Sequence, residues 1–146
     1  MTAEEYLSQI RRIDKRIEAL SRDEEKTRSR LYNISGIDYS KDRVDGGGDG
    51  DISSRLICVD NILTGIAKKK IYLIEARETA RQRINALSDD RCIPILTDYY
   101  ISALPIEAII RAENYEQAQI YRLRKRGVEC FGHEYYRWLM SMTNAY

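Results

Sequence analysis

Two long stripes of apolar residues, spaced alternately three and four residues apart, constrain this chain more than any other feature. The first stripe runs from Ala3 to Ile34 and includes Ile10 and Ile13, and the second runs from Ile52 to Leu87 and includes Val59 and Ile66. A three-four spacing places side chains on one face of an α-helix and is the signature of a coiled-coil seam. The sequence therefore predicts two long helices, each with an apolar seam that another helix must cover.

The segment between the two stripes favours a connector rather than a third helix. Residues 35–51 read SGIDYSKDRVDGGGDGD, which is polar, acidic and rich in glycine. Such a composition is typical of flexible loops. Two seamed helices joined in this way most simply form an antiparallel coiled-coil hairpin, although two chains could pair through the same seams instead. We therefore expect a helical hairpin over residues 1–87, with a flexible loop at about 35–51.

Caps and polar seam positions refine this prediction. Thr2 and Glu5 form a Ser/Thr-x-x-Glu capping box, which marks the start of the first helix. Polar residues also occupy seam positions in both helices, and such interruptions can set register or orientation at a cost in stability. They are Glu24 and Thr27 in the first helix, and Lys70 and Arg77 in the second.

Residues 88–146 contain shorter predicted helices. The first covers roughly residues 90–101, and the second opens at Pro105, a residue favoured at the first helical position. We expect Asn114 to cap the third helix, with Gln117 as its capping-box partner. A last aromatic segment, HEYYRWLMSM, is expected to pack as a short helix. The inward face of the third helix is expected to consist of Ile120, Leu123, Gly127, Val128 and Phe131.

The second and third of these helices are a candidate helix-turn-helix, because a tight turn at about residues 112–114 joins them. In that motif the second helix enters the major groove of DNA. Its glutamines and arginines can bond adenine and guanine edges, and its other cations can neutralise phosphates. No acid lies between Gln117 and Val128, so the local charge is positive. The expected DNA-binding residues are Glu116, Gln117, Gln119, Tyr121, Arg122, Arg124, Lys125 and Arg126.

This part of the chain, from about Leu87 to Phe131, resembles the region 4 helix-turn-helix of sigma-70-type factors. The parts that carry the resemblance are Ile95-Leu96 with Tyr99-Tyr100, then Ile106-Glu107-Ala108-Ile109, and then the inward face of the third helix. The chain as a whole, including EYLSQIRRIDKRI and ISGIDYSKDRV, looks like small phage-encoded sigma-like regulators, a group related to the RinA-type and ArpU-type late regulators. It departs from the family pattern at Gly127, where Ala is usual.

The resemblance implies a specific architecture and activity. The expected fold is all-α, with the hairpin of residues 1–87 followed by a sigma region 4-like helix-turn-helix domain at 88–146 that ends in the aromatic helix. The implied function is phage or prophage transcription regulation at promoters, through double-stranded DNA and host RNA polymerase, in the cytoplasm of a bacterial host cell.

Composition and motifs give no indication of a metal site, a cofactor, an enzyme or a membrane span. The 146-residue chain has a formal net charge of only +1, so any positive field is local. The three cysteines lack a CxxC pair, and His133 has no second ligand at zinc spacing, so we expect neither a metal nor another cofactor. No P-loop lysine, nucleophile elbow or paired-carboxylate motif predicts an enzyme or a catalytic residue. No apolar run approaches the roughly 18 residues of a membrane span, so we expect a soluble protein.

A protein-interaction module is the alternative to a DNA-binding regulator. In that case the hairpin seams, or the aromatic tail with Tyr135, Tyr136 and Trp138, would bind RNA polymerase or another host protein without reading DNA. A homodimer through the hairpin is compatible with both alternatives. The two differ in salt dependence, because binding to phosphates weakens steeply with salt and an apolar helix contact does not.

Overall fold

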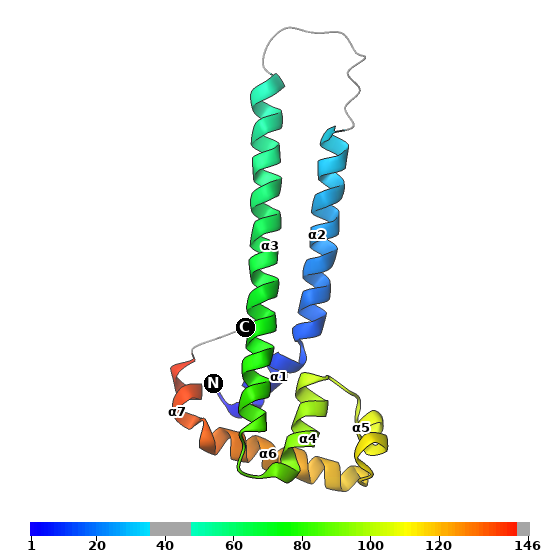
Figure 1. The fold of residues 1–146 in the computed structure, drawn as a ribbon, viewed down its shortest axis with the longest axis vertical. Coiled ribbons are helices and arrows are strands. Elements are labelled where there is room, and N and C mark those ends of the chain that lie inside the picture. Colours follow the sequence, from blue (N-terminus) through cyan, green and yellow to red (C-terminus); the bar gives the residue numbers. More distant parts are fainter. Residues whose placement is uncertain (36–47, 143–146) are drawn as a thin grey trace. The chain divides into compact units, whose positions relative to one another are not determined.

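The structure is a computed structural model that describes residues 1–35 and 48–142, and its regular structure in these ranges is entirely helical (Figure 1). This confirms the predicted all-α class. In chain order the elements are α1 (Ala3–Arg11), α2 (Ile13–Ser35), α3 (Gly48–Asn85), the 3-10 turn η1 (Asp90–Cys92), α4 (Ile93–Leu96), the π-helical turn η2 (Thr97–Ile101), α5 (Ile106–Glu113), α6 (Gln117–Glu134) and α7 (Tyr136–Ser141).

The chain divides into two compact units. One is Lys15–Tyr72, and the other combines Met1–Asp14 with Leu73–Tyr146. This division differs from the predicted ranges 1–87 and 88–146. The physical reason is that α1 and the C-terminal part of α3 contribute buried side chains to the core that also contains α6.

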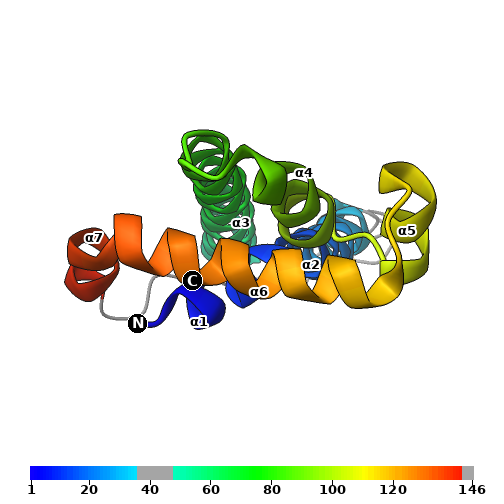
Figure 2. The same cartoon turned by 90° about the horizontal axis from the view of Figure 1, so that it is seen from below.

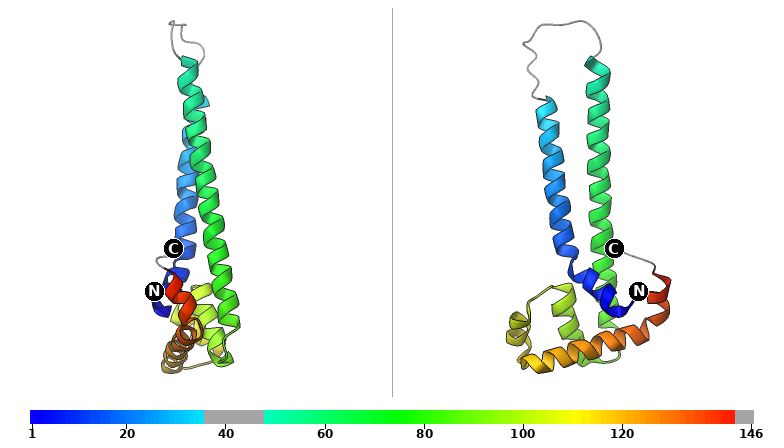
Figure 3. Two further views of the ribbon diagram at one scale, coloured as in Figure 1. Left: turned by 90° about the vertical axis from the view of Figure 1, so that its left-hand side faces the viewer. Right: turned by 180° about the vertical axis from the view of Figure 1, so that it is seen from behind.

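Within the first of these units, α2 and α3 lie side by side, as the two views of Figure 3 show. Glu24 of α2 accepts a hydrogen bond from Lys70 of α3, with 2.5 Å between Oε2 and Nζ. In the other unit, Asp14 pairs with Arg77. Within the Lys15–Tyr72 unit the sequence colours of α2 and α3 run in opposite directions, so the two helices are antiparallel (Figure 3). The hydrogen bond from Lys70 is also the main cause that holds the pKa of Glu24 below its usual value.

The covered face of α3 in the Lys15–Tyr72 unit is the predicted seam face. Val59 and Ile66, both seam positions, are buried. Thr27 of α2 is buried as well, and its hydroxyl donates to the carbonyl oxygen of Asp23 at 2.8 Å. A polar seam residue is therefore accommodated by a hydrogen bond within its own helix, which removes the cost of an unsatisfied buried hydroxyl.

The predicted continuous helix over residues 2–34 is interrupted at Arg12. The helix α1 ends just before this residue and α2 begins just after it, and the Arg12 amide donates to the carbonyl of Gln9 at 3.1 Å. The predicted capping box is confirmed. The Glu5 amide donates to the Thr2 hydroxyl at 3.2 Å, and the Thr2 amide donates to the Glu5 carboxylate at 2.8 Å.

The predicted connector at 35–51 lies largely outside the described residues. Its last part does not, because α3 begins at Gly48. Residues 48–51 are therefore helical, and the prediction that the loop extends to residue 51 is wrong.

An aromatic core joins α1, α6 and α7. The ring of Tyr6 stacks on Phe131 with centroids 5.8 Å apart, and it meets Trp138 edge-on at 4.9 Å. The hydroxyl of Tyr135 donates to the carbonyl of Arg83 at 3.0 Å, which ties the end of α6 to α3. In Figure 2, α6 runs lengthwise, with α5 at one end and α7 at the other.

Candidate nucleic-acid interface

A three-residue turn, residues 114–116, joins α5 to α6. Asn114 adopts the left-handed conformation, with φ 54° and ψ 33°, and its amide donates to the carbonyl of Ile110 at 3.1 Å. It is therefore the C-cap of α5. The prediction that Asn114 caps the third helix with Gln117 as its partner is wrong, because α6 begins at Gln117 and its N-cap is Glu116.

A compact apolar cluster supports this pair of helices. Ile95 of α4, Ile109 of α5 and Ile120 of α6 are fully buried against one another. Burial of three such side chains from three elements fixes α6 relative to α5 and α4. Half-buried residues complete the cluster: Tyr99, Leu104, Ile106, Ile110, Tyr115 and Leu123.

The inward face of α6 agrees with the predicted spacing. Ile120, Gly127 and Phe131 are buried, and Leu123 and Val128 are half-buried. With this face turned inward, helical periodicity places the opposite face of α6 in solvent.

The most outward stripe of α6 consists of Ala118, Arg122, Lys125 and Glu129, which are all exposed. The side chain of Arg122 lies along the helix, and its Nε donates to the carbonyl of Ala118 at 3.3 Å. Lys125 follows one turn later. Glu129 ends the positive stretch, so the basic surface is confined to the N-terminal half of the helix.

The other predicted residues flank this stripe. Gln119 and Arg126 lie on one side, where they line a shallow hollow together with Arg122 and Leu123. Gln117 and Tyr121 lie on the other side, and both are exposed. Glu116 is exposed as well, at the position just before the helix starts.

Arg124 is held against the protein, unlike its basic neighbours. Its guanidinium carbon lies 4.6 Å from the centroid of the Tyr99 ring and 5.4 Å from that of Tyr121. Cation–π contacts of this kind restrict the side chain. Arg11 also contacts Tyr99, at 3.9 Å from the centroid, and donates to the carbonyl of Leu104 at 3.1 Å. Tyr99 thus lies between α1 and the basic face of α6.

Arg126, one of the predicted DNA contacts, has an acidic partner outside its own helix. Its Nε lies 2.6 Å from Oδ2 of Asp89, at the start of η1, and Arg91 approaches the other carboxylate oxygen at 3.4 Å. Burial alone would raise the pKa of Asp89. The hydrogen bond from Arg91 and the charges of Arg126 and Arg91 outweigh this effect, so the pKa lies below its usual value. Asp89 is therefore ionised at neutral pH.

Two residues near this surface, Asp89 and Tyr99, were not predicted as site residues. Neither carries a local signal, because each acts through a partner distant in sequence: Asp89 contacts Arg126, and Tyr99 contacts Arg124. An acid or an aromatic residue in an isolated sequence does not identify such a partner.

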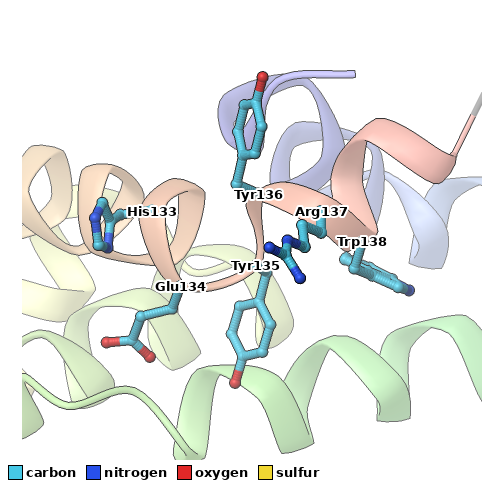
Figure 4. Close-up of a pocket in the computed structure, with 6 residues that line it drawn as sticks. All are labelled: His133, Glu134, Tyr135, Tyr136, Arg137 and Trp138. Carbon is cyan, nitrogen blue, oxygen red and sulfur yellow. The ribbon is translucent and has the colours of Figure 1, made fainter.

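A second surface feature lies where α6 meets α7. His133 to Trp138 line a hollow there, and Figure 4 shows the rings of Tyr135 and Tyr136 pointing in opposite directions. The guanidinium carbon of Arg83 lies 3.8 Å from the centroid of the Trp138 ring. Tyr136 is 62% exposed and Met140, one turn later, is 59% exposed. Tyr136 and Met140 therefore form an exposed apolar pair on α7, beside the exposed Arg137 and Ser141.

No protein-family model, curated protein or solved structure matches this chain. The likeness to sigma region 4 thus remains a prediction from the sequence pattern. Within residues 1–35 and 48–142, no group of three His, Cys, Asp or Glu side chains could hold a metal ion. None of the helices in the same ranges is long and apolar enough to cross a membrane.

Proposed function

We propose that this chain is a phage-type transcription regulator that binds double-stranded DNA, with α5 and α6 acting as a helix-turn-helix. The observation that supports this most is the exposed basic half of α6, on a helix that is held in place by the Ile95, Ile109 and Ile120 cluster. A rigid helix with an outward row of Gln and Arg side chains is suited to the major groove. The proposed function requires no cofactor and no catalytic residue.

The proposed contacts with DNA are of two kinds, those to base edges and those to phosphates. Gln117 and Gln119, near the start of α6, and Arg122, one turn on, have the chemistry to bond base edges. Lys125 lies further along and would neutralise a phosphate. Arg124 would contribute less than its charge suggests, because Tyr99 and Tyr121 hold its guanidinium.

The resemblance to sigma factors leads us to propose host RNA polymerase as a second partner. Host RNA polymerase would be recruited to the promoter that α6 recognises, in the host cytoplasm. The antiparallel α2 and α3 would act as a spacer, a dimerisation element or a polymerase contact.

A binding titration tests the proposal. Duplexes enriched from a random pool would be compared with scrambled duplexes at several salt concentrations. We expect a preferred sequence and a log–log salt slope of about −0.9 for each phosphate contact. Replacing both Arg122 and Lys125 by Ala should weaken binding. A matched double variant, Lys15→Ala with Arg16→Ala, removes the same charge from exposed positions of α2 and should have a much smaller effect. Equal losses in both variants would contradict a specific role for α6.

One observation favours a second candidate function, that of a protein-interaction module. Tyr136 and Met140 form an exposed apolar pair on α7, and such a face suits a groove on another protein, including RNA polymerase. Binding through this face should change little with salt. Replacing Tyr136 and Met140 by Ser should abolish polymerase capture under this alternative, and should leave DNA affinity unchanged under the first.

A further inference from the structure

The helix α3 has a second stripe of residues at heptad spacing, with an isoleucine at each end, besides the face that meets α2. Ile57 and Ile71 are 62% and 56% exposed, although they lie two heptads apart on one side of the helix. Asp60, Thr64 and Ala67 complete the same three-four spacing between them, and all three are exposed. Exposed isoleucines at heptad spacing are typical of a helix face that another helix covers.

The unit that contains this stripe has little interior of its own. Among its described side chains, those classed as buried are Thr27, Val59 and Ile66. A pair of helices gains most of its stability from covered apolar side chains, and a four-helix bundle covers more of each helix than a pair does. A second copy of the same unit would supply the missing cover.

We propose that the stripe from Ile57 to Ile71 is a homodimer interface, where the α3 helices of two copies pair antiparallel and build a four-helix bundle. This inference goes beyond DNA binding and does not depend on it.

Charge and side-chain size select the antiparallel orientation. In a parallel pair, Asp60 would face Asp60 of the second copy within the seam, and like charges would be buried together. In an antiparallel pair with its two-fold axis at Thr64, the two copies of this small side chain meet at the centre. Ile57 then lies opposite Ile71 of the second copy, and Asp60 lies opposite the second copy's Lys68. The antiparallel pair therefore matches apolar with apolar and acid with base.

Sedimentation equilibrium of the full chain tests the interface. We expect twice the mass of one chain at micromolar concentration. Ile71→Asp should raise the dimer dissociation constant at least tenfold without lowering helical content, because Ile71 is exposed within one chain. Ile62→Asp is the matched control, since Ile62 is 42% exposed on another side of α3. A monomeric wild type, or equal dissociation by both variants, would overturn the proposal.

Disulfide trapping tests the orientation independently. In a Cys58→Ser background, which removes the exposed thiol of α3, a mixture of Ile57→Cys and Ile71→Cys chains should form a mixed disulfide under mild oxidation. Ile57→Cys should not cross-link to itself, because the two copies of this position would be about 21 Å apart along the axis at 1.5 Å per residue. Cross-linking of Ile57→Cys to itself, without the mixed product, would show a parallel pair and overturn the antiparallel assignment.

Discussion

The Nε atom of Arg126 lies 2.6 Å from Oδ2 of Asp89, so an acid from the start of η1 meets the basic face of α6. The carboxylate is largely covered, with 14% of its side chain exposed, whereas Arg126 is 61% exposed. The arginine can therefore still reach a ligand, but part of its charge is already balanced. Asp89 lowers the positive potential at one flank of the proposed DNA-binding surface.

Asp89→Asn should strengthen DNA binding. Without the carboxylate, Arg126 can pair with a phosphate, so affinity at low salt should rise and the log–log salt slope should steepen by about one contact. Anisotropy titrations on one duplex at several salt concentrations would measure both. Asp90→Asn is the matched control, because it removes the same charge from the exposed neighbouring position. If both variants bind equally tightly, general charge and not the Arg126 contact sets the affinity.

Variants of the outward stripe of α6 should separate into two types. Arg122→Ala and Gln117→Ala should each cost about 1–3 kcal/mol on the preferred duplex and relax its sequence preference. Lys125→Ala should weaken preferred and scrambled duplexes alike and reduce the salt slope by about one. The measurement is a titration of the three variants on both duplexes. Unchanged affinity and slope in all three would mean that this face is merely solvated, and would favour the interaction module.

The polar seam positions show how much of the fold could be predicted from the sequence. The pattern alone identified Glu24 and Lys70 as exceptions within two apolar stripes, and in the structure they pair with each other. The three-four spacing also predicted which face of α3 is covered, as the burial of Val59 and Ile66 shows. Periodicity is a local property of each helix, so it could be recognised without knowing the register between the helices.

Other features could not be predicted, because the same local sequence pattern is compatible with two different structures. Ile10 and Ile13 are both buried and keep the seam spacing across the break at Arg12, so the pattern hides the end of α1. Asn114 is favoured both as an N-cap and as a left-handed C-cap, and only the packing of α5 decides between them. For the candidate site, the contact between Asp89 and Arg126 depends on how distant segments fold together.

Gly127→Ala should destabilise the protein although Ala favours helix. A Cβ atom at this position would lie 2.8 Å from Cδ1 of Leu96 and 3.0 Å from Cβ of Cys92, both fully buried. Overpacking of this kind costs about 1–3 kcal/mol, against a gain of about 1 kcal/mol in helix propensity. The net loss should appear as a lower midpoint in chemical denaturation.

Gly65→Ala supplies the control for that substitution. Its added Cβ would have no atom within 4 Å, so the variant should gain about 0.5–1 kcal/mol from helix propensity alone. Opposite signs for the two glycines are expected. A stabilised Gly127→Ala would show that α4 can move away from α6 without cost. The close approach of Leu96 is the reason why a Cβ atom does not fit at this position without a shift of its neighbours.

Glu113, the last residue of α5, gives the unit that contains α6 a defined pH dependence. Burial is the main cause that raises the pKa of this carboxyl above its usual value of 4.5, and the charge of Asp98 and a hydrogen bond with Asp98 act in the same direction. The position at a helix C-terminus adds to the cost of a negative charge. A raised pKa means that the folded state binds the proton more tightly than the unfolded state does. The contribution of Glu113 to stability is therefore complete at low pH and is lost as pH rises from 4.5 through the raised pKa.

Glu113→Gln should consequently raise Tm at pH 7 and have less effect at pH 4, where the carboxyl of the wild type is protonated in the folded state. Thermal melts of both chains across this range would show a difference that grows with pH and then levels off. Glu107→Gln, on the exposed side of the same helix, removes one carboxylate without touching Asp98 and should produce no such trend. A difference between Glu113→Gln and the wild type that stays constant with pH would mean that the proximity of Glu113 to Asp98 does not influence folding.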